Sequence, residues 1–70
     1  MSEVALARLW QLPDGTRCLL LKDSTGQKWE VRVERQGGTL RSELFGSPIV
    51  AMEEGKHWRS SFDRSFQTSS

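Results

Sequence analysis

The sequence predicts an α+β fold in which four antiparallel strands, joined as a meander, are followed by one C-terminal helix packed on one sheet face. Two observations favour this class. Apolar and charged residues alternate on both sides of the pair Gly37-Gly38, which is typical of a β-hairpin. After this hairpin, Ser47-Pro48 precedes a segment whose apolar residues recur at helical spacing.

The first expected strand runs from Val4 to Leu12 and ends at the turn Pro13-Asp14-Gly15. Proline suits the first central position of a type I turn, aspartate the second, and glycine the left-handed residue that follows. The segment before the turn is also rich in helix formers, and Ser2 is a suitable helix N-cap. We favour a strand for this element, with a helix as the alternative.

The second and third strands are expected at 16–23 and 27–36, joined by Ser24-Thr25-Gly26. This connection has the same three-residue form as the first, with glycine last. Two three-residue turns would place Leu19 opposite both Leu9 and Val31, and Leu21 opposite Trp29.

The third reversal is assigned to Gly37-Gly38 as a two-residue turn. Counting back from this turn places Glu34 opposite Arg41. The same register places Arg32 opposite Glu43. One sheet face would therefore carry two cross-strand pairs of opposite charge, while the other face is mainly apolar.

A helix is expected from Pro48 to about Phe62, with Ser47 as its N-cap and proline at its first position. Its apolar stripe contains Ile49, Ala51, Met52, Trp58 and Phe62. Gly55 lies on the same side, which allows either close packing of the helix or an early break. Residues 1–62 then form one small domain, and residues 63–70 form a flexible polar tail.

Length and composition restrict the functions. A chain of 70 residues buries only about 60% of the surface that its unfolded form exposes, so its core is small. One cysteine and one histidine provide neither an internal disulfide nor a zinc site, and we expect no metal and no cofactor. The net charge of +1 gives no overall electrostatic attraction to nucleic acid. Without a basic leader or an apolar run of about 20 residues, we expect a cytoplasmic protein without membrane association.

The expected register divides the sheet into two faces. The face under the helix would contain Ala7, Leu9, Leu19, Leu21, Trp29, Val31, Val33 and Leu44. The opposite face would be apolar on the first two strands and charged on the last two. Apolar residues grouped on a surface usually mark an interface. We therefore predict a partner-binding surface made of Leu6, Trp10, Cys18 and Leu20; an N-terminal helix folded over this face is the alternative cover.

The favoured function is a small non-catalytic interaction module, which self-associates as a homodimer or docks on a protein partner through this apolar half of the sheet. The alternative is a single-stranded nucleic-acid-binding domain. The order of elements is similar to that of Whirly-type and Pur-type domains, in which the sheet face receives the strand, although this is an analogy of fold alone. The residues available for this role are Arg8, Trp10, Arg17, Lys22, Lys28 and Arg32.

Catalytic chemistry has little support in the sequence. Cys18 and His57 could form a nucleophile and its base, but one is expected within a strand and the other late in the helix. Glu54 and His57 have the spacing found in di-metal helical bundles, but one copy on one helix is a weak signal. We therefore expect no enzyme activity and assign no catalytic residue.

Overall fold

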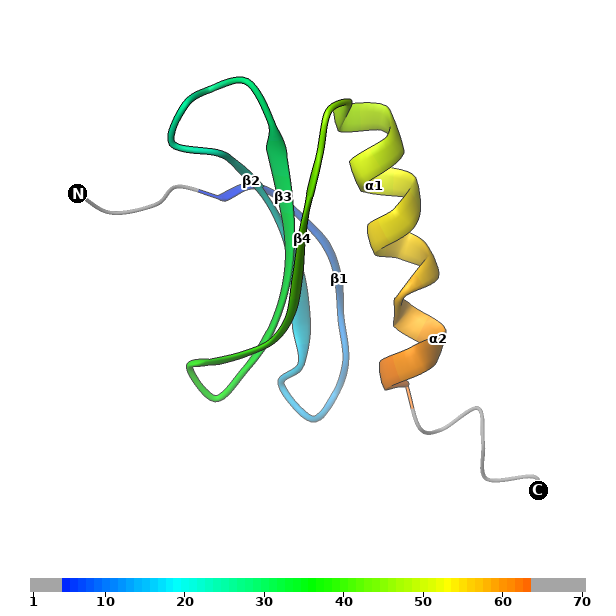
Figure 1. The fold of residues 1–70 in the computed structure, drawn as a ribbon. Coiled ribbons are helices and arrows are strands. Elements are labelled where there is room, and N and C mark those ends of the chain that lie inside the picture. Colours follow the sequence, from blue (N-terminus) through cyan, green and yellow to red (C-terminus); the bar gives the residue numbers. More distant parts are fainter. Residues whose placement is uncertain (1–4, 64–70) are drawn as a thin grey trace.

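The computed structural model describes residues 5–63 and contains the predicted meander. The strands β1 (Ala5–Gln11), β2 (Arg17–Lys22), β3 (Trp29–Arg35) and β4 (Gly38–Phe45) form one antiparallel sheet in the order β1-β2-β3-β4. The helices α1 (Pro48–His57) and α2 (Arg59–Phe62) follow and cover one face of this sheet (Figure 1). The first element is thus a strand, not the alternative helix. Of the predicted tail at 63–70, Asp63 is buried and its N–H donates to the Arg59 carbonyl at the end of α2, whereas residues 64–70 lie outside the described residues.

The β1–β2 turn is the predicted one. The Gly15 N–H donates to the Leu12 carbonyl at 3.0 Å, and Gly15 has a φ of 95°, in the left-handed region. Beyond the turn, β1 is irregular between Ala5 and Ala7 and again between Arg8 and Trp10. Because of the second irregularity, Leu19 pairs with Arg8 and not, as predicted, with Leu9.

The β2–β3 connection is one residue longer than predicted. The Asp23 N–H donates to the Lys28 carbonyl at 2.9 Å, which leaves the four residues 24–27 between them. Trp29 consequently pairs with Lys22 and not with Leu21. Because side chains alternate between faces, this shift of one residue moves every β2 side chain to the face opposite the predicted one.

The β3–β4 turn also differs by one residue. It consists of Gln36-Gly37, with φ values of 55° and 80°, and Arg35 pairs with Gly38. Two central residues with positive φ are the signature of a type I′ turn, whose twist matches that of the strands. Leu40 is the extra residue of a β-bulge, because Val33 pairs with Arg41 whereas Glu34 pairs with Thr39.

This register removes the predicted cross-strand charge pairs. Arg41 lies opposite Val33, and Glu43 lies opposite Val31. The charges pair along each strand instead: Arg41 contacts Glu43 at 2.8 Å, and Arg32 contacts both glutamates on either side of it in β3. The cross-strand prediction was therefore wrong because both the turn position and the bulge shift β4 relative to β3.

The helix begins as predicted, since the Ser47 side chain accepts from the Val50 N–H and Pro48 occupies the first turn. The helix is interrupted at Trp58, which separates α1 from α2. Gly55 is the site of close packing: a Cβ there would meet Leu9 Cδ1 and lie 3.0 Å from Val31 Cγ1. Ile49 does not belong to the buried stripe, because 67% of its surface is exposed.

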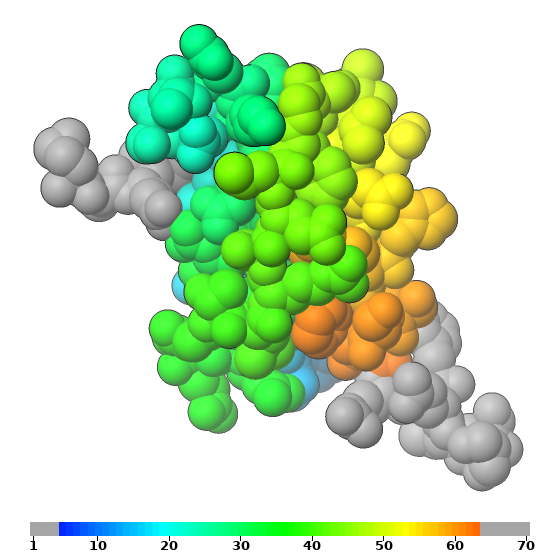
Figure 2. All heavy atoms as spheres, viewed as in Figure 1, coloured from blue at the N-terminus to red at the C-terminus, as the bar shows by residue number. Residues whose placement is uncertain are grey.

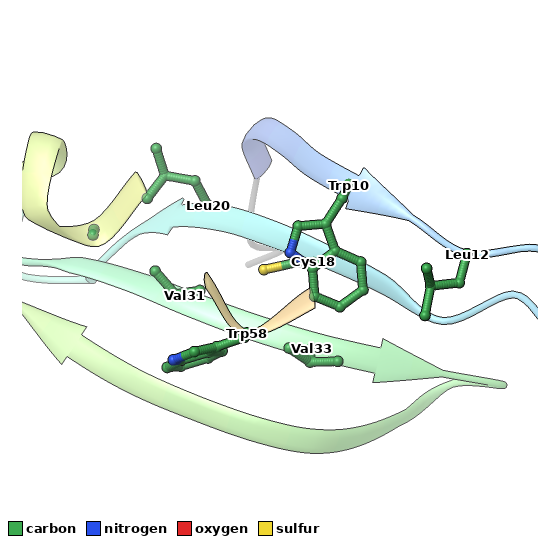
Figure 3. Close-up of a cluster of buried hydrophobic side chains, with 8 residues drawn as sticks. Trp10, Leu12, Cys18, Leu20, Val31, Val33 and Trp58 are labelled. Carbon is green, nitrogen blue, oxygen red and sulfur yellow. The ribbon is translucent and has the colours of Figure 1, made fainter. Parts of the chain in front are cut away.

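The core lies between the sheet and the helices (Figure 3). Its buried members are Trp10, Leu12, Cys18, Leu20, Val31, Val33, Ala51 and Trp58. Val31 and Val33 were predicted there. Leu19 and Leu44 were predicted there too, but they pair on the opposite face, and Leu44 is 54% exposed. No helix among residues 5–63 has the length and apolar character needed to span a membrane.

Candidate interaction surface

The side of the sheet away from the helices, called the open face below, follows from the strand register. By register, the residues on this side are Ala5, Arg8, Gln11, Arg17, Leu19, Leu21, Glu30, Arg32, Glu34, Thr39, Ser42 and Leu44. Leu21 is the one residue among them that is buried. The sheet is bent, so that the β2–β3 and β3–β4 connections both project toward this side (Figure 1). The helices leave this face uncovered.

The predicted partner-binding residues do not share a surface. Trp10, Cys18 and Leu20 are buried beneath the helices, whereas Leu6 is exposed on β1. For Cys18 and Leu20, the longer β2–β3 connection is the cause, because it turns these side chains toward the helix. The expected grouping of all four on the uncovered face was therefore wrong.

Trp10 links the sheet to the helix. Its indole Nε1 donates a 2.7 Å hydrogen bond to the carbonyl oxygen of Gly55, and its ring packs 6.1 Å from the ring of Phe62. Both the polar edge and the apolar body of this side chain thus have partners inside the protein. As a result, Trp10 is not presented on the surface for base stacking.

Cys18 is a protonated thiol in the core. Its Sγ lies 3.9 Å from the Gly55 carbonyl oxygen, and burial raises the pKa of the Cys18 thiol to about 11. Nucleophilic cysteines need the thiolate form, which a raised pKa disfavours at neutral pH. His57, the other half of the possible catalytic pair, lies exposed at the end of α1. Between residues 5 and 63, no group of three or more His, Cys, Asp or Glu side chains is placed to hold a metal ion.

The open face carries a row of alternating charges at its centre. Arg32 contacts Glu30 at 3.0 Å and Glu34 at 3.5 Å, and Glu34 also contacts Arg17 on the neighbouring strand at 3.4 Å. Less than a fifth of each β3 side chain in this row is exposed. The positive charges in this row are therefore largely neutralised by carboxylates.

The predicted nucleic-acid-binding residues are dispersed. Arg8, Arg17 and Arg32 lie on the open face, but Trp10 is in the core. Lys22 lies on the helix side of the sheet, with its Nζ 5.7 Å from the centre of the Trp29 ring. Lys28 belongs to the β2–β3 connection. Only half of the set thus shares one face, and Arg17 and Arg32 there are paired with glutamates.

The outer edge of β4 was missed by sequence reasoning. Leu40 and Leu44 are 42% and 54% exposed, and the charged pair of Arg41 and Glu43 lies between them in the chain. Arg41 also lies over the Trp58 ring, with its Cζ 3.9 Å from the ring centre. The β4 residues face the viewer in Figure 2, and no helix lies over them. The feature that moves Leu44 out of the core is the bulge at Leu40, because the turn at Gln36-Gly37 shifts the pairing by two residues and keeps each side chain on its face, whereas the bulge adds a single residue.

No protein-family model matches this chain, and comparisons with curated proteins and with solved structures also find no match. The similarity to Whirly-type and Pur-type domains therefore stays an analogy in the order of elements.

Proposed function

We propose that this protein is a small non-catalytic interaction module that self-associates, or docks on a protein partner, through the part of its sheet that the helices leave uncovered. The observation that carries this proposal is the exposure of Leu40 and Leu44 on β4, a terminal strand of the sheet. Large aliphatic side chains along an unpaired sheet edge favour association with another chain.

The small size of the domain supports the same conclusion. A single core of this size rarely supplies more than roughly 3–5 kcal/mol of stability unless a disulfide, a metal or a partner chain contributes. The sequence has one cysteine, so no internal disulfide contributes. A partner that binds only the folded chain would add stability by mass action.

The charge arrangement favours a protein partner over a nucleic acid. A phosphate-binding face presents arginines whose charge is free to neutralise phosphates. Here Arg32 lies between two glutamates, and Arg17 contacts one of them. A protein surface with its own mixed charges matches such an alternating row better than a polyanion does.

A non-catalytic role agrees with the state of Cys18. Because burial raises the pKa of its thiol to about 11, the thiolate form is scarce at neutral pH. We therefore place no reaction at this residue.

The test is the molar mass in solution, measured by sedimentation equilibrium from low micromolar to near-millimolar concentration. We expect reversible self-association. The variant Leu44→Thr, which keeps a residue compatible with a strand, should weaken it several-fold. The control Ile49→Thr, at a helical position that is also exposed, should leave it unchanged.

A parent protein that keeps the mass of one chain throughout would contradict self-association. Titration of the tryptophan fluorescence with a single-stranded oligonucleotide at low salt then separates the two remaining functions, docking on a protein partner and nucleic-acid binding. Quenching that disappears as salt is added would replace the proposal with nucleic-acid binding, because such contacts release counterions.

A further inference from the structure

We propose that β4 pairs antiparallel with β4 of a second copy of this chain about a two-fold axis at Ser42, so that one sheet continues through both copies. This inference rests on the self-association proposed above and names the strand and the register that mediate it. In such a dimer, the helices of both copies lie on the same side of the combined sheet.

The edge of β4 is available for pairing. β4 is the last strand in the sheet order, so one side of its backbone lacks a neighbouring strand within the described residues. Figure 2 shows this strand uncovered by α1 and α2. From Arg41 to Phe45 its pairing with β3 is regular, which leaves a straight row of N–H and C=O groups directed outward.

The opposite edge is less suitable. β1 is irregular between Ala5 and Ala7 and again between Arg8 and Trp10, so no long regular stretch is available along it. Bulges of this kind twist an edge and interrupt its hydrogen-bonding groups, which discourages strand addition. The regular part of β4 is therefore the edge that favours a second strand.

The charges along β4 are self-complementary in one register. With Ser42 opposite Ser42 of the second copy, Arg41 faces Glu43 of that copy. The two-fold axis repeats this pair, so the interface contains two opposite-charge pairs. Leu40 is the bulge residue at the end of this regular row, so Arg41 and Glu43 alone determine the register.

The neighbouring registers are disfavoured by like charges. Paired side chains must lie on the same face, so the register can shift only by two residues in this symmetric arrangement. A shift of two residues moves the two-fold axis by one residue. In one direction the axis then lies at Arg41, so that Arg41 faces Arg41 of the second copy. A shift in the other direction does the same for Glu43. The sequence Arg41-Ser42-Glu43 thus specifies the register centred on Ser42.

The arginine is already held in position in the single chain. Arg41 contacts Glu43 at 2.8 Å and lies over the Trp58 ring at 3.9 Å. A side chain with a restricted position loses less conformational freedom when a partner arrives. About 40–50% of the surface of both charged side chains remains exposed, which leaves each accessible to the second copy.

A charge-exchange experiment tests the register. The variants Arg41→Glu and Glu43→Arg each place like charges opposite one another in their own homodimer. We expect each variant alone to dissociate at least tenfold more readily than the parent. When the two variants are mixed in equal amounts, opposite charges face one another again, and we expect a heterodimer with an affinity near that of the parent.

Native mass spectrometry of the mixture identifies the heterodimer, because the two variants differ in mass. Circular dichroism of each variant checks that it remains folded, since Arg41→Glu also removes the contact with Trp58. The control Glu53→Arg changes the net charge as Glu43→Arg does, but at an exposed position of α1, and should dimerise like the parent.

The outcomes separate this inference from the broader proposal. A parent that self-associates while both single variants associate equally well would overturn the β4 interface and leave self-association through another surface. Folded single variants that stay monomeric when mixed would overturn the register. A parent that is monomeric at every concentration would overturn the β4 dimer together with self-association, and would leave docking on a different protein as the proposed function.

Discussion

The indole N–H of Trp10 and the carbonyl oxygen of Gly55 form a 2.7 Å hydrogen bond between β1 and α1. The two residues depend on each other. Because Gly55 has no side chain, the backbone of α1 approaches the sheet closely enough for its carbonyl to be reached. The indole in turn gives this buried carbonyl a strong donor, close to the point where the helix is interrupted.

We predict that Trp10→Phe lowers the free energy of unfolding by about 1–3 kcal/mol. Phenylalanine keeps an aromatic ring in the core but removes the N–H, which leaves the Gly55 oxygen without its indole donor. Urea denaturation followed by circular dichroism measures the change, and an unaltered m-value indicates that the same surface is exposed on unfolding.

The matched control for this prediction is Trp58→Phe. Trp58 is as buried as Trp10, but its indole N–H makes no hydrogen bond with residues 5–63. We expect Trp58→Phe to lower the free energy of unfolding by less than Trp10→Phe does. Equal losses for the two variants would show that ring size, and not the hydrogen bond to Gly55, determines the cost.

We predict that Gly55→Ala destabilises the protein, although alanine is the better helix former by about 1 kcal/mol. The added methyl would meet Leu9 Cδ1 and crowd Val31 Cγ1, and overpacking of this kind costs about 1–3 kcal/mol. Thermal or urea unfolding measures the net effect, which we expect to be a loss of up to about 2 kcal/mol.

A double-mutant cycle with Leu9→Ala identifies the cause of this loss. Shortening Leu9 removes the atom that meets the new methyl, so Leu9→Ala should cost less in the Gly55→Ala background than in the parent. Strictly additive effects would mean that the two positions do not contact each other.

The sequence was sufficient to predict the order of the elements. The turn at Pro13-Asp14-Gly15 and the helix start at Ser47-Pro48 each combine residues with strong local preferences, and both occur as predicted. At these two positions the local preferences of the residues favour one conformation, without a contribution from residues distant in the sequence.

The composition of each sheet face could not be predicted in the same way. The run from Cys18 to Leu21 is apolar on both faces, so it does not indicate which face meets the helix. One additional loop residue, Gln27, decides this by shifting β2 against β3. A sheet register depends on such single residues, and an error of one position exchanged the predicted interface with the core.

The candidate surface on β4 was missed for a related reason. Two adjacent glycines offered a natural two-residue turn, but the structure uses Gln36 with Gly37, and Gln36 takes a left-handed conformation that residues other than glycine rarely adopt. The bulge at Leu40 then adds a second shift. Because this extra residue changes the face of every β4 side chain after it, it places Arg41 and Glu43 on the helix side and exposes Leu44.

The turn provides the next prediction. We expect Gln36→Asn to stabilise the protein by about 0.5 kcal/mol, because asparagine tolerates positive φ better than glutamine and Asn-Gly is a preferred type I′ pair. The midpoint of urea denaturation should rise. Gly37→Ala, at a φ of 80°, should lower the midpoint. A lowered midpoint for Gln36→Asn would contradict the assigned turn.

The last prediction concerns stability at alkaline pH. Burial raises the pKa of the Cys18 thiol from 9.0 to about 11, so the folded chain keeps this proton over a range in which the unfolded chain releases it. The stabilising contribution is complete below pH 9 and is lost as the pH rises through 11. A shift of this size corresponds to a loss of roughly 3 kcal/mol in the free energy of unfolding.

The comparison with Cys18→Ala isolates this effect, because the variant has no thiol but keeps every other titrating group. The sequence has no tyrosine, so phenol ionisation does not contribute in this range. We expect the free energy of unfolding of the parent to fall more steeply than that of Cys18→Ala above about pH 9. Parallel pH profiles would show that the thiol ionises equally in both states, as it would if water reached Cys18 beneath the helix.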